Sequence, residues 1–312
     1  MNISNESYTD EKFLKYLFRT NTGDVRLIWL FVIIPIYLVC AIILNRLIFI
    51  IITTQFYLAD GYVQTIALEQ AQTQMMTLEA QAVLCAIDAL LMILLVFLLI
   101  TKIEKRDFQW STLGLSLKSS SILYFVLGTF LGFLFILITR GVSLIRGTIQ
   151  LQLLELEEIF TQANVKFMIL FFVWAMLNGF WQEIVFRGYL QNRVIETHNV
   201  TVGILTVTIY FVLVHFIDRQ LTFHWVLAGT LLFILISLLF HHTKSLYLVG
   251  AMHGTINYLD QVAELIGLEW TSPMSIYWLD NIILLGVTLG IYILISFLIT
   301  KRKVKSEKKL SN

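Results

Sequence analysis

Residues 81–101 read QAVLCAIDALLMILLVFLLIT, and Asp88, which we interpret as a helix-contact residue, is the one charged side chain in this stretch. A transmembrane helix needs about 17–25 largely apolar residues, so the stretch is long enough to cross a bilayer. Similar stretches occur along the chain, and the predicted spans are 27–52, 81–101, 121–143, 166–190, 201–217, 222–240, 245–259 and 281–300. None alternates with the period of two that the strands of a membrane barrel need. Because only helices and closed barrels satisfy all backbone groups in lipid, the sequence predicts an all-α bundle of about eight transmembrane helices.

The composition is typical of a polytopic membrane protein. Of the 312 residues, 58% belong to the apolar set AVILMFWYC and 14% are charged, and the mean hydropathy is +0.80. A soluble domain has about 45–50% apolar and about 25% charged residues, so a soluble enzyme and a disordered protein are both excluded. The net charge of +1 argues against a nucleic-acid partner. Cys40 and Cys85 lie in apolar stretches, where we expect buried thiols and no disulfide.

The distribution of Lys and Arg predicts the orientation in the membrane. Basic residues gather in the N-terminal segment, in the loop 102–120 and in the tail 301–309, whereas the loops 55–80 and 260–280 carry acidic residues and no Lys or Arg. Since basic loops stay in the cytoplasm, we expect a multi-pass protein of the cell membrane with both termini cytoplasmic and a tail that meets anionic headgroups. No cleavable signal peptide is expected, because no apolar stretch precedes Leu27.

Polar side chains that could carry chemistry occur inside three predicted spans. Glu183 and Arg187 are four residues apart, so they share a helix face and can pair. His215 lies in the next span, and His253 and Asn257 share a face of the seventh. Each has a structural explanation of its own, as a buried ion pair, a core histidine or a hydrogen bond between helices. Because ionisable groups are costly in lipid, their coincidence on three helices favours a functional site.

These residue types suit hydrolysis. A carboxylate and a neutral imidazole can together deprotonate a water, while a second imidazole and an Asn amide can stabilise an oxyanion. Two His and an acid could instead bind zinc, but no HExxH pairing is present and Asn is a poor zinc ligand. The set therefore favours peptide hydrolysis inside the membrane, with no metal and no cofactor.

In these residues the chain resembles the CPBP family, the intramembrane proteases of CAAX processing and bacteriocin processing, also called Abi. The family motifs are EExxxR, FxxxH and HxxxN or HxxxD, and residues 182–187, 211–215 and 253–257 correspond to them in this order. The Leu113-Gly114-Leu115 stretch is also similar to what the family carries before its third span. The resemblance divides the chain into an N-terminal region with two spans (1–100), a CPBP-like catalytic core (101–260) and a last span with the basic tail (261–312).

The resemblance implies an eight-helix intramembrane endopeptidase of the glutamate type. In that family the first Glu of EExxxR, helped by the His of FxxxH, activates water. Carried over, His215 assists the base, His253 and Asn257 donate to the oxyanion, and Glu183 with Arg187 positions the helix. The substrate expected is a membrane-bound peptide or prepeptide, in bacteriocin or signal-peptide processing or in self-immunity.

The first Glu of that motif corresponds to Gln182, which is a departure from the family pattern. An amide holds a water by hydrogen bonding but has no titratable proton acceptor. Three explanations stay open: a substitution introduced by design, a natural pseudoprotease, or a takeover of the base role by Glu183. The alternative to a protease is accordingly a catalytically silent membrane adaptor that regulates a partner membrane protein. A small transporter is disfavoured, because no paired repeats are visible.

The predicted boundaries leave a mismatch in depth. They put Gln182 near the cytoplasmic end of the fourth span and His215 near the outer end of the fifth. At 1.5 Å per residue these positions are more than roughly 10 Å apart across the membrane. Either the fourth helix runs on past Arg193, or short helices tilt around a wet cavity.

Overall fold

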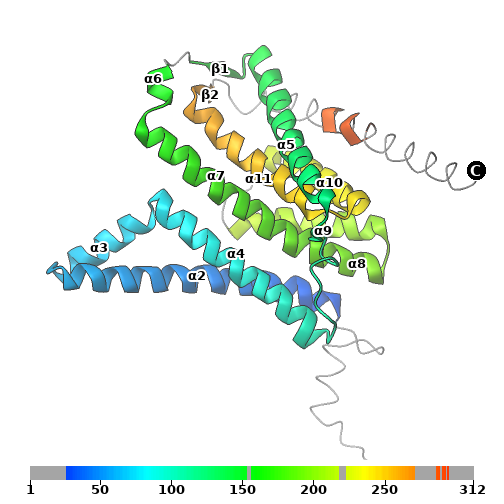
Figure 1. Cartoon of the computed structure of the whole chain (residues 1–312), viewed down its shortest axis with the longest axis horizontal. Helices are drawn as coiled ribbons and strands as arrows, with labels where there is room; N and C mark the ends of the chain where they lie inside the picture. The colour runs from blue at the N-terminus through cyan, green and yellow to red at the C-terminus, as the bar shows by residue number, and fades with distance from the viewer. Residues whose placement is uncertain are drawn as a thin grey trace, which may run out of the picture.

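The computed structural model describes residues 26–152, 156–217 and 223–270, together with 286–288, 290–292 and 294. The elements in chain order are α2 (Leu27–Ala59), α3 (Gln64–Met75), α4 (Leu78–Leu98), the π-helix η1 (Leu99–Ile103), α5 (Ser119–Ile145), β1 (Ile149–Leu151), α6 (Leu156–Ile159), α7 (Gln162–Glu183), the π-helix η2 (Ile184–Gln191), α8 (Asn192–Thr197), α9 (Val200–Val214), the 3-10 turn η3 (His215–Ile217), α10 (Phe223–Thr243), α11 (Leu246–Leu265) and β2 (Leu268–Trp270). The two short strands pair antiparallel and join the ends of α5 and α11, as Figure 1 shows.

The prediction of an all-α polytopic membrane protein is confirmed. Among the described residues, six helices are long and apolar enough to cross a membrane: 27–59, 78–103, 119–145, 162–197, 200–217 and 225–243. The predicted seventh span is the 20-residue helix α11, whose polar residues lower its hydropathy below that of the six. Most of the predicted eighth span, 281–300, lies outside the described residues. The count of eight therefore stays a prediction.

The acidic loop after the first span contains a helix that the sequence analysis missed. Helix α3 is rich in Gln and Thr and has no apolar stripe to mark it, yet it folds back along the end of α2 (Figure 1). The next helix, α4, begins at a visible signal, because the Thr77 side chain caps it by accepting from the Ala80 backbone N–H. Helix α2 itself runs on to Ala59, beyond its predicted end.

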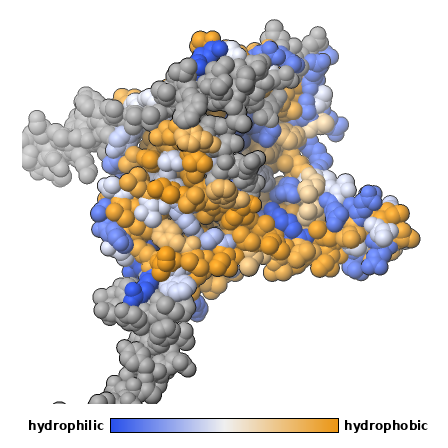
Figure 2. Space-filling model, turned by 180° about the vertical axis from the view of Figure 1, so that it is seen from behind, coloured by the Kyte–Doolittle hydropathy of each residue, from blue (hydrophilic) through white to orange (hydrophobic). Residues whose placement is uncertain are grey.

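Apolar side chains cover the outer surface. Figure 2 shows orange residues over much of the visible face, and along α2 the side chains of Ile28, Ile36, Leu44 and Phe56 are all more than half exposed. Such a surface suits lipid, in which exposed apolar residues carry no hydrophobic penalty. Cys40 is also exposed, so the prediction that it is buried is wrong, whereas Cys85 is buried as predicted. A thiol in a lipid-facing apolar stretch needs no protein cover.

Glycines allow α5, α7 and α11 to pack closely. A Cβ at Gly128 of α5 would lie 2.1 Å from the Leu248 carbonyl oxygen of α11, and one at Gly179 of α7 would lie 2.6 Å from the Gly254 backbone nitrogen of α11. Helices in membranes associate through such small residues, because lipid supplies no hydrophobic drive between them. The close approach of α7 and α11 brings the first and third sequence motifs together.

Asp88 holds α2 against α4. Its Oδ1 accepts from the Asn45 amide at 2.9 Å and its Oδ2 from Arg46 Nη1 at 2.7 Å. The same Asn45 nitrogen lies 3.1 Å from the Leu84 carbonyl oxygen. The interpretation of Asp88 as a helix-contact residue is therefore confirmed, and both of its partners lie in the first predicted span.

Candidate active site

The centre of the bundle holds a buried ion pair with a histidine attached. Oε1 of Glu183 lies 3.2 Å from Nη1 of Arg187 and 2.8 Å from Nδ1 of His253. The side chains of Glu183 and Arg187 are completely buried, and that of His253 is almost so. The predicted pairing of Glu183 with Arg187 is thus formed, and a third group from α11 joins it.

Aromatic rings enclose the guanidinium of Arg187. Its central carbon lies 4.4 Å from the centre of the Phe211 ring and 5.3 Å from that of Phe233. Its Nη2 reaches the Phe233 carbonyl oxygen at 3.5 Å. A desolvated cation over aromatic faces gains about 2 kcal/mol, which offsets part of its burial cost. The arginine therefore ties the motif helix to α9, which carries Phe211, and to α10, which carries Phe233.

A π-helix begins at the residue after Glu183. The segment η2 continues the axis of α7, and every residue from Glu183 to Gln191 is buried. Single π turns interrupt α-helices most often at functional sites, because the wider turn re-aims side chains. No local sequence pattern marked this change of helical geometry.

Gln182 faces in a different direction from its neighbour Glu183. Its side chain lines a cavity of about 350 Å³, here called the α11 cavity, which is also lined by His215, His253 and Asn257. It lines in addition a cavity of about 210 Å³, here called the α2 cavity, whose walls include Arg46 and His215. Glu183 belongs to the walls of neither. The structure thus brings Gln182, His215, His253 and Asn257 to one cavity and keeps Glu183 behind His253.

Hydrogen bonds orient the side chains of Gln182 and His215, which line both cavities. Gln182 Nε2 donates to Asn178 Oδ1 at 3.1 Å, and Trp181 Nε1 donates to the same oxygen at 3.1 Å. The His215 Nδ1 lies 2.8 Å from the Phe211 carbonyl oxygen, and its ring lies nearly parallel to that of Phe233. A carbonyl accepts only, so Nδ1 of His215 carries a proton and Nε2 is the acceptor in the neutral ring.

The mismatch in depth is resolved by the length of the fourth helix. It runs through η2 and α8 to Thr197, past Arg193, as the first of the two explanations requires. Gln182 is then fifteen residues before the end of α8, and His215 fifteen residues after the start of α9. At 1.5 Å per residue both lie about 22 Å from the turn between these helices. The predicted end of the span at residue 190 was too early.

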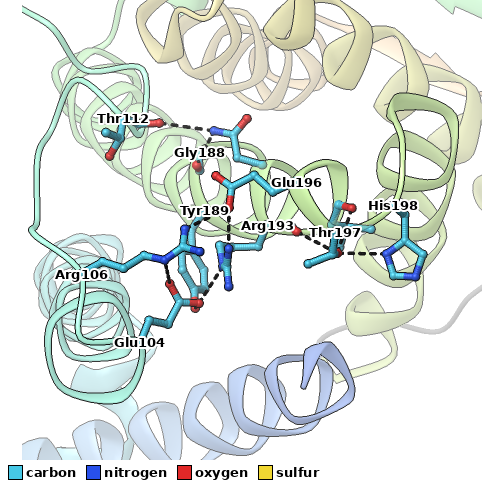
Figure 3. Close-up of polar contacts among 11 residues, drawn as sticks. Glu104, Arg106, Thr112, Gly188, Tyr189, Arg193, Glu196, Thr197 and His198 are labelled. Carbon is cyan, nitrogen blue, oxygen red and sulfur yellow. Dashed lines mark hydrogen bonds and ion pairs between the residues drawn. The ribbon is translucent and has the colours of Figure 1, made fainter. Parts of the chain in front are cut away.

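A second polar cluster, which the sequence analysis missed, lies at the end of this helix (Figure 3). Glu104 Oε1 accepts from the Tyr189 hydroxyl at 2.9 Å and from Arg193 Nε at 2.7 Å. Glu196 Oε2 accepts from Arg106 Nη1 at 3.0 Å and also from Arg193. The cluster joins the end of η1 to α8, and the spacing of Arg193 and Glu196 was its one visible signal in the sequence.

The Leu113-Gly114-Leu115 stretch positions the start of α11. The carbonyl oxygen of Gly114 accepts from the Leu246 backbone N–H at 3.0 Å. Gly114 has φ +90°, and a Cβ there would lie 2.9 Å from the Phe240 ring, so only glycine suits this position. A Cβ at Gly188 of η2 would lie 2.9 Å from the Leu113 carbonyl oxygen. The stretch therefore lies between the end of the first motif and the start of the helix that carries the third.

Within the part of the chain that the structure describes, His, Cys, Asp and Glu side chains form no group of three or more that could hold a metal ion. Hydrolysis without a metal stays a prediction.

Comparison with known proteins supports the motifs. Residues 164–259 match a family model described as type II CAAX prenyl endopeptidase Rce1-like. The matched segment contains Gln182 and the five other residues of the predicted site. No curated protein and no solved structure matches the chain. Residues 164–259 are therefore similar to the type II CAAX prenyl endopeptidases, and this match confirms the resemblance of the chain to the CPBP family.

Proposed function

We propose that this chain is an intramembrane endopeptidase that hydrolyses a peptide lying in or entering the bilayer, with the Glu183–His253 pair as its base. The family match supports protease activity and a membrane-embedded peptide or protein substrate. The observation that carries the proposal is the distance of 2.8 Å between Glu183 Oε1 and His253 Nδ1, in a residue pair that has one member on the wall of the α11 cavity.

The pairing determines which nitrogen of His253 can act as a base. A carboxylate accepts only, so Nδ1 of His253 carries the proton of this hydrogen bond. Nε2 is then the lone-pair nitrogen that takes a proton from a water in the cavity. The negative charge of Glu183 stabilises the imidazolium that results, as a buried carboxylate does in other carboxylate–histidine pairs. Arg187 donates to the same carboxylate through Nη1 at 3.2 Å and so helps to hold it in place.

The remaining residues of the cavity bind and polarise. Asn257 is four residues after His253 and lines the same cavity, where its amide can donate to a developing oxyanion. Gln182 and His215 lie on the walls of both cavities. The Gln182 amide holds the water or the scissile carbonyl by hydrogen bonds but takes no proton, and His215 assists as a second imidazole. Water fits, because the cavity is polar and far larger than one molecule requires.

A second candidate function follows from Gln182 itself. If the base of this fold must be a carboxylate at position 182, the chain binds peptides or a partner membrane protein without cleaving them. The intact Glu183, Arg187, His215, His253 and Asn257 favour the protease.

The orientation proposed is that of a cell-membrane protein with both termini in the cytoplasm. The basic loop 102–120, the turn at His198 and the turn at Lys244 then lie on the cytoplasmic side, and α3 and the β1–β2 pair on the other. Single cysteines at Lys105 and Gln70, in a background with Cys40 and Cys85 replaced by Ser, test this with an impermeant maleimide on intact cells. Labelling at position 70 and not at 105 is expected, and the reverse pattern contradicts the proposal.

The function is tested by a cleavage assay on purified protein. The chain as given, Gln182→Glu, His253→Gln and His215→Ala are each reconstituted with a library of apolar peptides, and products are identified by mass spectrometry. His198→Ala is the matched control, because His198 lies in the α8–α9 turn, where its Nδ1 lies 2.9 Å from the Thr197 hydroxyl and away from both cavities.

Each outcome decides between the two candidates. Cleavage by the chain as given and by His198→Ala, reduced about 10²–10⁴-fold in His253→Gln, supports the proposed base. Cleavage by Gln182→Glu alone supports the silent adaptor, because the chain as given then lacks the required base at position 182. Cleavage that survives His253→Gln contradicts the role of the pair.

A further inference from the structure

The α2 cavity has a charged wall that lies outside the segment matched by the family model. Arg46 and Asp88 belong to α2 and α4, whereas the match begins at residue 164. We infer that Arg46 binds a carboxylate of the peptide that occupies the site, and so makes the α2 cavity a subsite for a substrate with a free C-terminus or an acidic side chain. That the bound peptide is a substrate rests on the proposed function. The binding itself is testable without cleavage.

The hydrogen bonds around Asp88 leave Arg46 facing the cavity. Both oxygens of Asp88 are already engaged, Oδ1 by Asn45 and Oδ2 by Arg46, and its side chain is 8% exposed. The side chain of Arg46 is 27% exposed and uses Nη1 for this contact. An arginine has five N–H donors in a planar fork, so the edge not turned to Asp88 can bind a second carboxylate. Asp88 therefore orients the guanidinium and does not exhaust it.

A clamp between helices alone would not need a charge on a cavity wall. Asn45 already bridges Asp88 and the Leu84 carbonyl oxygen. Ionisable groups within membrane spans are costly, and those that persist face cavities and substrate paths. In this chain the partly exposed side chain of Arg46 borders the same cavity as Gln182 and His215.

The two cavities meet at the proposed catalytic residues. Trp174, Asn178, Gln182 and His215 line both of them. A peptide lying across Gln182 therefore reaches into the α2 cavity on one side and the α11 cavity on the other. At about 210 Å³, the α2 cavity is the smaller of the two, and most of its wall is apolar. It suits a short piece of chain with one anionic group.

The ion pairs at the two ends of this path differ in which member is more exposed. Among the residues that line the α2 cavity, Arg46 is the one Lys or Arg, and the acidic group beside it is the engaged Asp88. The α11 cavity instead has Asp260 on its wall, which pairs with Arg140 and is the more exposed member of that pair. The more accessible member of the pair is therefore a cation at the α2 cavity and an anion at the α11 cavity, and this asymmetry favours a peptide orientation with its carboxylate at the Arg46 end.

The test measures binding of a defined peptide set to the full chain in phosphatidylcholine nanodiscs. The probes share one apolar sequence with an N-terminal fluorophore and end in a free carboxylate, end in an amide, or end in an amide with one internal Asp. Affinity is read by fluorescence anisotropy. Benzoylphenylalanine at Ile42, on the wall of the α2 cavity, reports by photo-crosslinking whether the peptide occupies that cavity.

At least one carboxylate probe is expected to bind about tenfold or more tightly than the plain amide, as charge-assisted hydrogen bonds are worth in partly buried sites. Arg46→Gln removes the difference and leaves the affinity of the amide probe unchanged. The double variant Arg46→Gln/Asp88→Asn removes both charges, so it gives the same result if the single variant folds poorly. Arg106→Gln, which removes an arginine from the ion-pair cluster of Figure 3 outside both cavities, keeps the preference.

The probes separate the sources of the carboxylate, and the assay separates this inference from the proposed function. Preference for the free C-terminus or for internal Asp names the source. Equal affinities, no saturable binding of any probe, or a preference that survives Arg46→Gln overturns the inference. Displacement of the carboxylate probe by 20% phosphatidylglycerol also overturns it, because the occupant is then a lipid headgroup. Absence of cleavage with a retained, Arg46-dependent preference refutes the protease and leaves the subsite standing.

Discussion

Two groups of charged residues on one continuous helix differ in how many of their buried polar atoms have a hydrogen-bond partner. At the centre, Glu183 and Arg187 form a completely buried pair joined by His253. Two turns further on, Arg193 belongs to the cluster with Glu104 that Figure 3 shows, in which one carboxylate oxygen accepts from two donors. In the described part of the chain, Gln182 Oε1, Glu183 Oε2 and Arg187 Nε are buried without a hydrogen-bond partner, whereas no atom of the Glu104 cluster is.

The difference distinguishes a cluster that stabilises the fold from the proposed site. Buried polar groups in folded proteins are nearly all hydrogen-bonded, and the exceptions call for a reason such as catalysis or an absent ligand. The Glu104 cluster satisfies its own groups and holds η1 against α8. The central group leaves the Gln182 Oε1 acceptor open on the walls of both cavities, as the proposed site for water and a peptide requires. Four substitutions test this comparison.

The largest effect is expected at Arg187. Arg187→Met leaves Glu183 completely buried with His253 as its one partner, and removing one member of a buried ion pair costs about 3–5 kcal/mol. Thermal unfolding in detergent, followed by fluorescence-detected size exclusion, measures the loss. The double variant Glu183→Leu/Arg187→Met is expected to recover more than half of it, because it leaves no buried charge. If the single variant is as stable as the unmodified protein, the claim that Glu183 depends on Arg187 for its burial is wrong.

A smaller loss is expected at Arg193, although it too is buried. Arg193→Met removes a charge-assisted hydrogen bond worth about 1.5–3 kcal/mol, but Glu104 keeps the Tyr189 hydroxyl at 2.9 Å and the guanidinium of Arg106 at 4.0 Å. The same unfolding measurement checks it, and any peptide cleavage or binding is expected to stay within twofold. A loss equal to that of Arg187→Met would remove the distinction between the two clusters.

Helix packing is the next in size and acts through distance. Gly179→Ala places a Cβ against the backbone of α11 at Gly254, and overpacking of this kind costs about 1–3 kcal/mol. Because it pushes α7 from α11, it is also expected to lengthen the contact of Glu183 with His253 and to lower activity. Gly141→Ala on α5 is the matched control, since a Cβ there meets nothing within 4 Å. Equal stability and activity of both variants would show that the close contact of α7 with α11 does not position the site.

The smallest effect is expected at the rim of the cluster. Arg106→Gln breaks an ion pair whose two side chains are about half exposed, and such pairs contribute about 0–1 kcal/mol. Its unfolding temperature is expected to remain close to that of the unmodified chain and to respond weakly to salt. A loss of unfolding free energy above about 2 kcal/mol would contradict this ranking. It would mean that Arg106 stabilises Glu104 strongly from a distance of 4.0 Å.

The sequence by itself determined the membrane class, the approximate positions of six spans and the three motifs. These features belong to contiguous residues, since hydropathy and the spacing of Glu183 and Arg187 are read within one helix. The division into three regions at residues 100 and 260 stays a prediction, as do the roles of the six site residues. Helix α3 was not predicted, because a polar helix that is held by its neighbours has no periodic hydrophobic signal of its own.

Only the tertiary structure decided which side chains meet and which of them line the cavities. Glu183 and His253 are 70 positions apart, and they meet because Gly179 and Gly254 allow α7 and α11 to touch. That Gln182 lines both cavities while Glu183 stands behind a histidine, and that Arg46 borders the site, depends on the rotation and depth of several helices at once. Hydropathy is nearly uniform around such helices, so the rotation of each is set by close packing between distant segments, which no local pattern encodes.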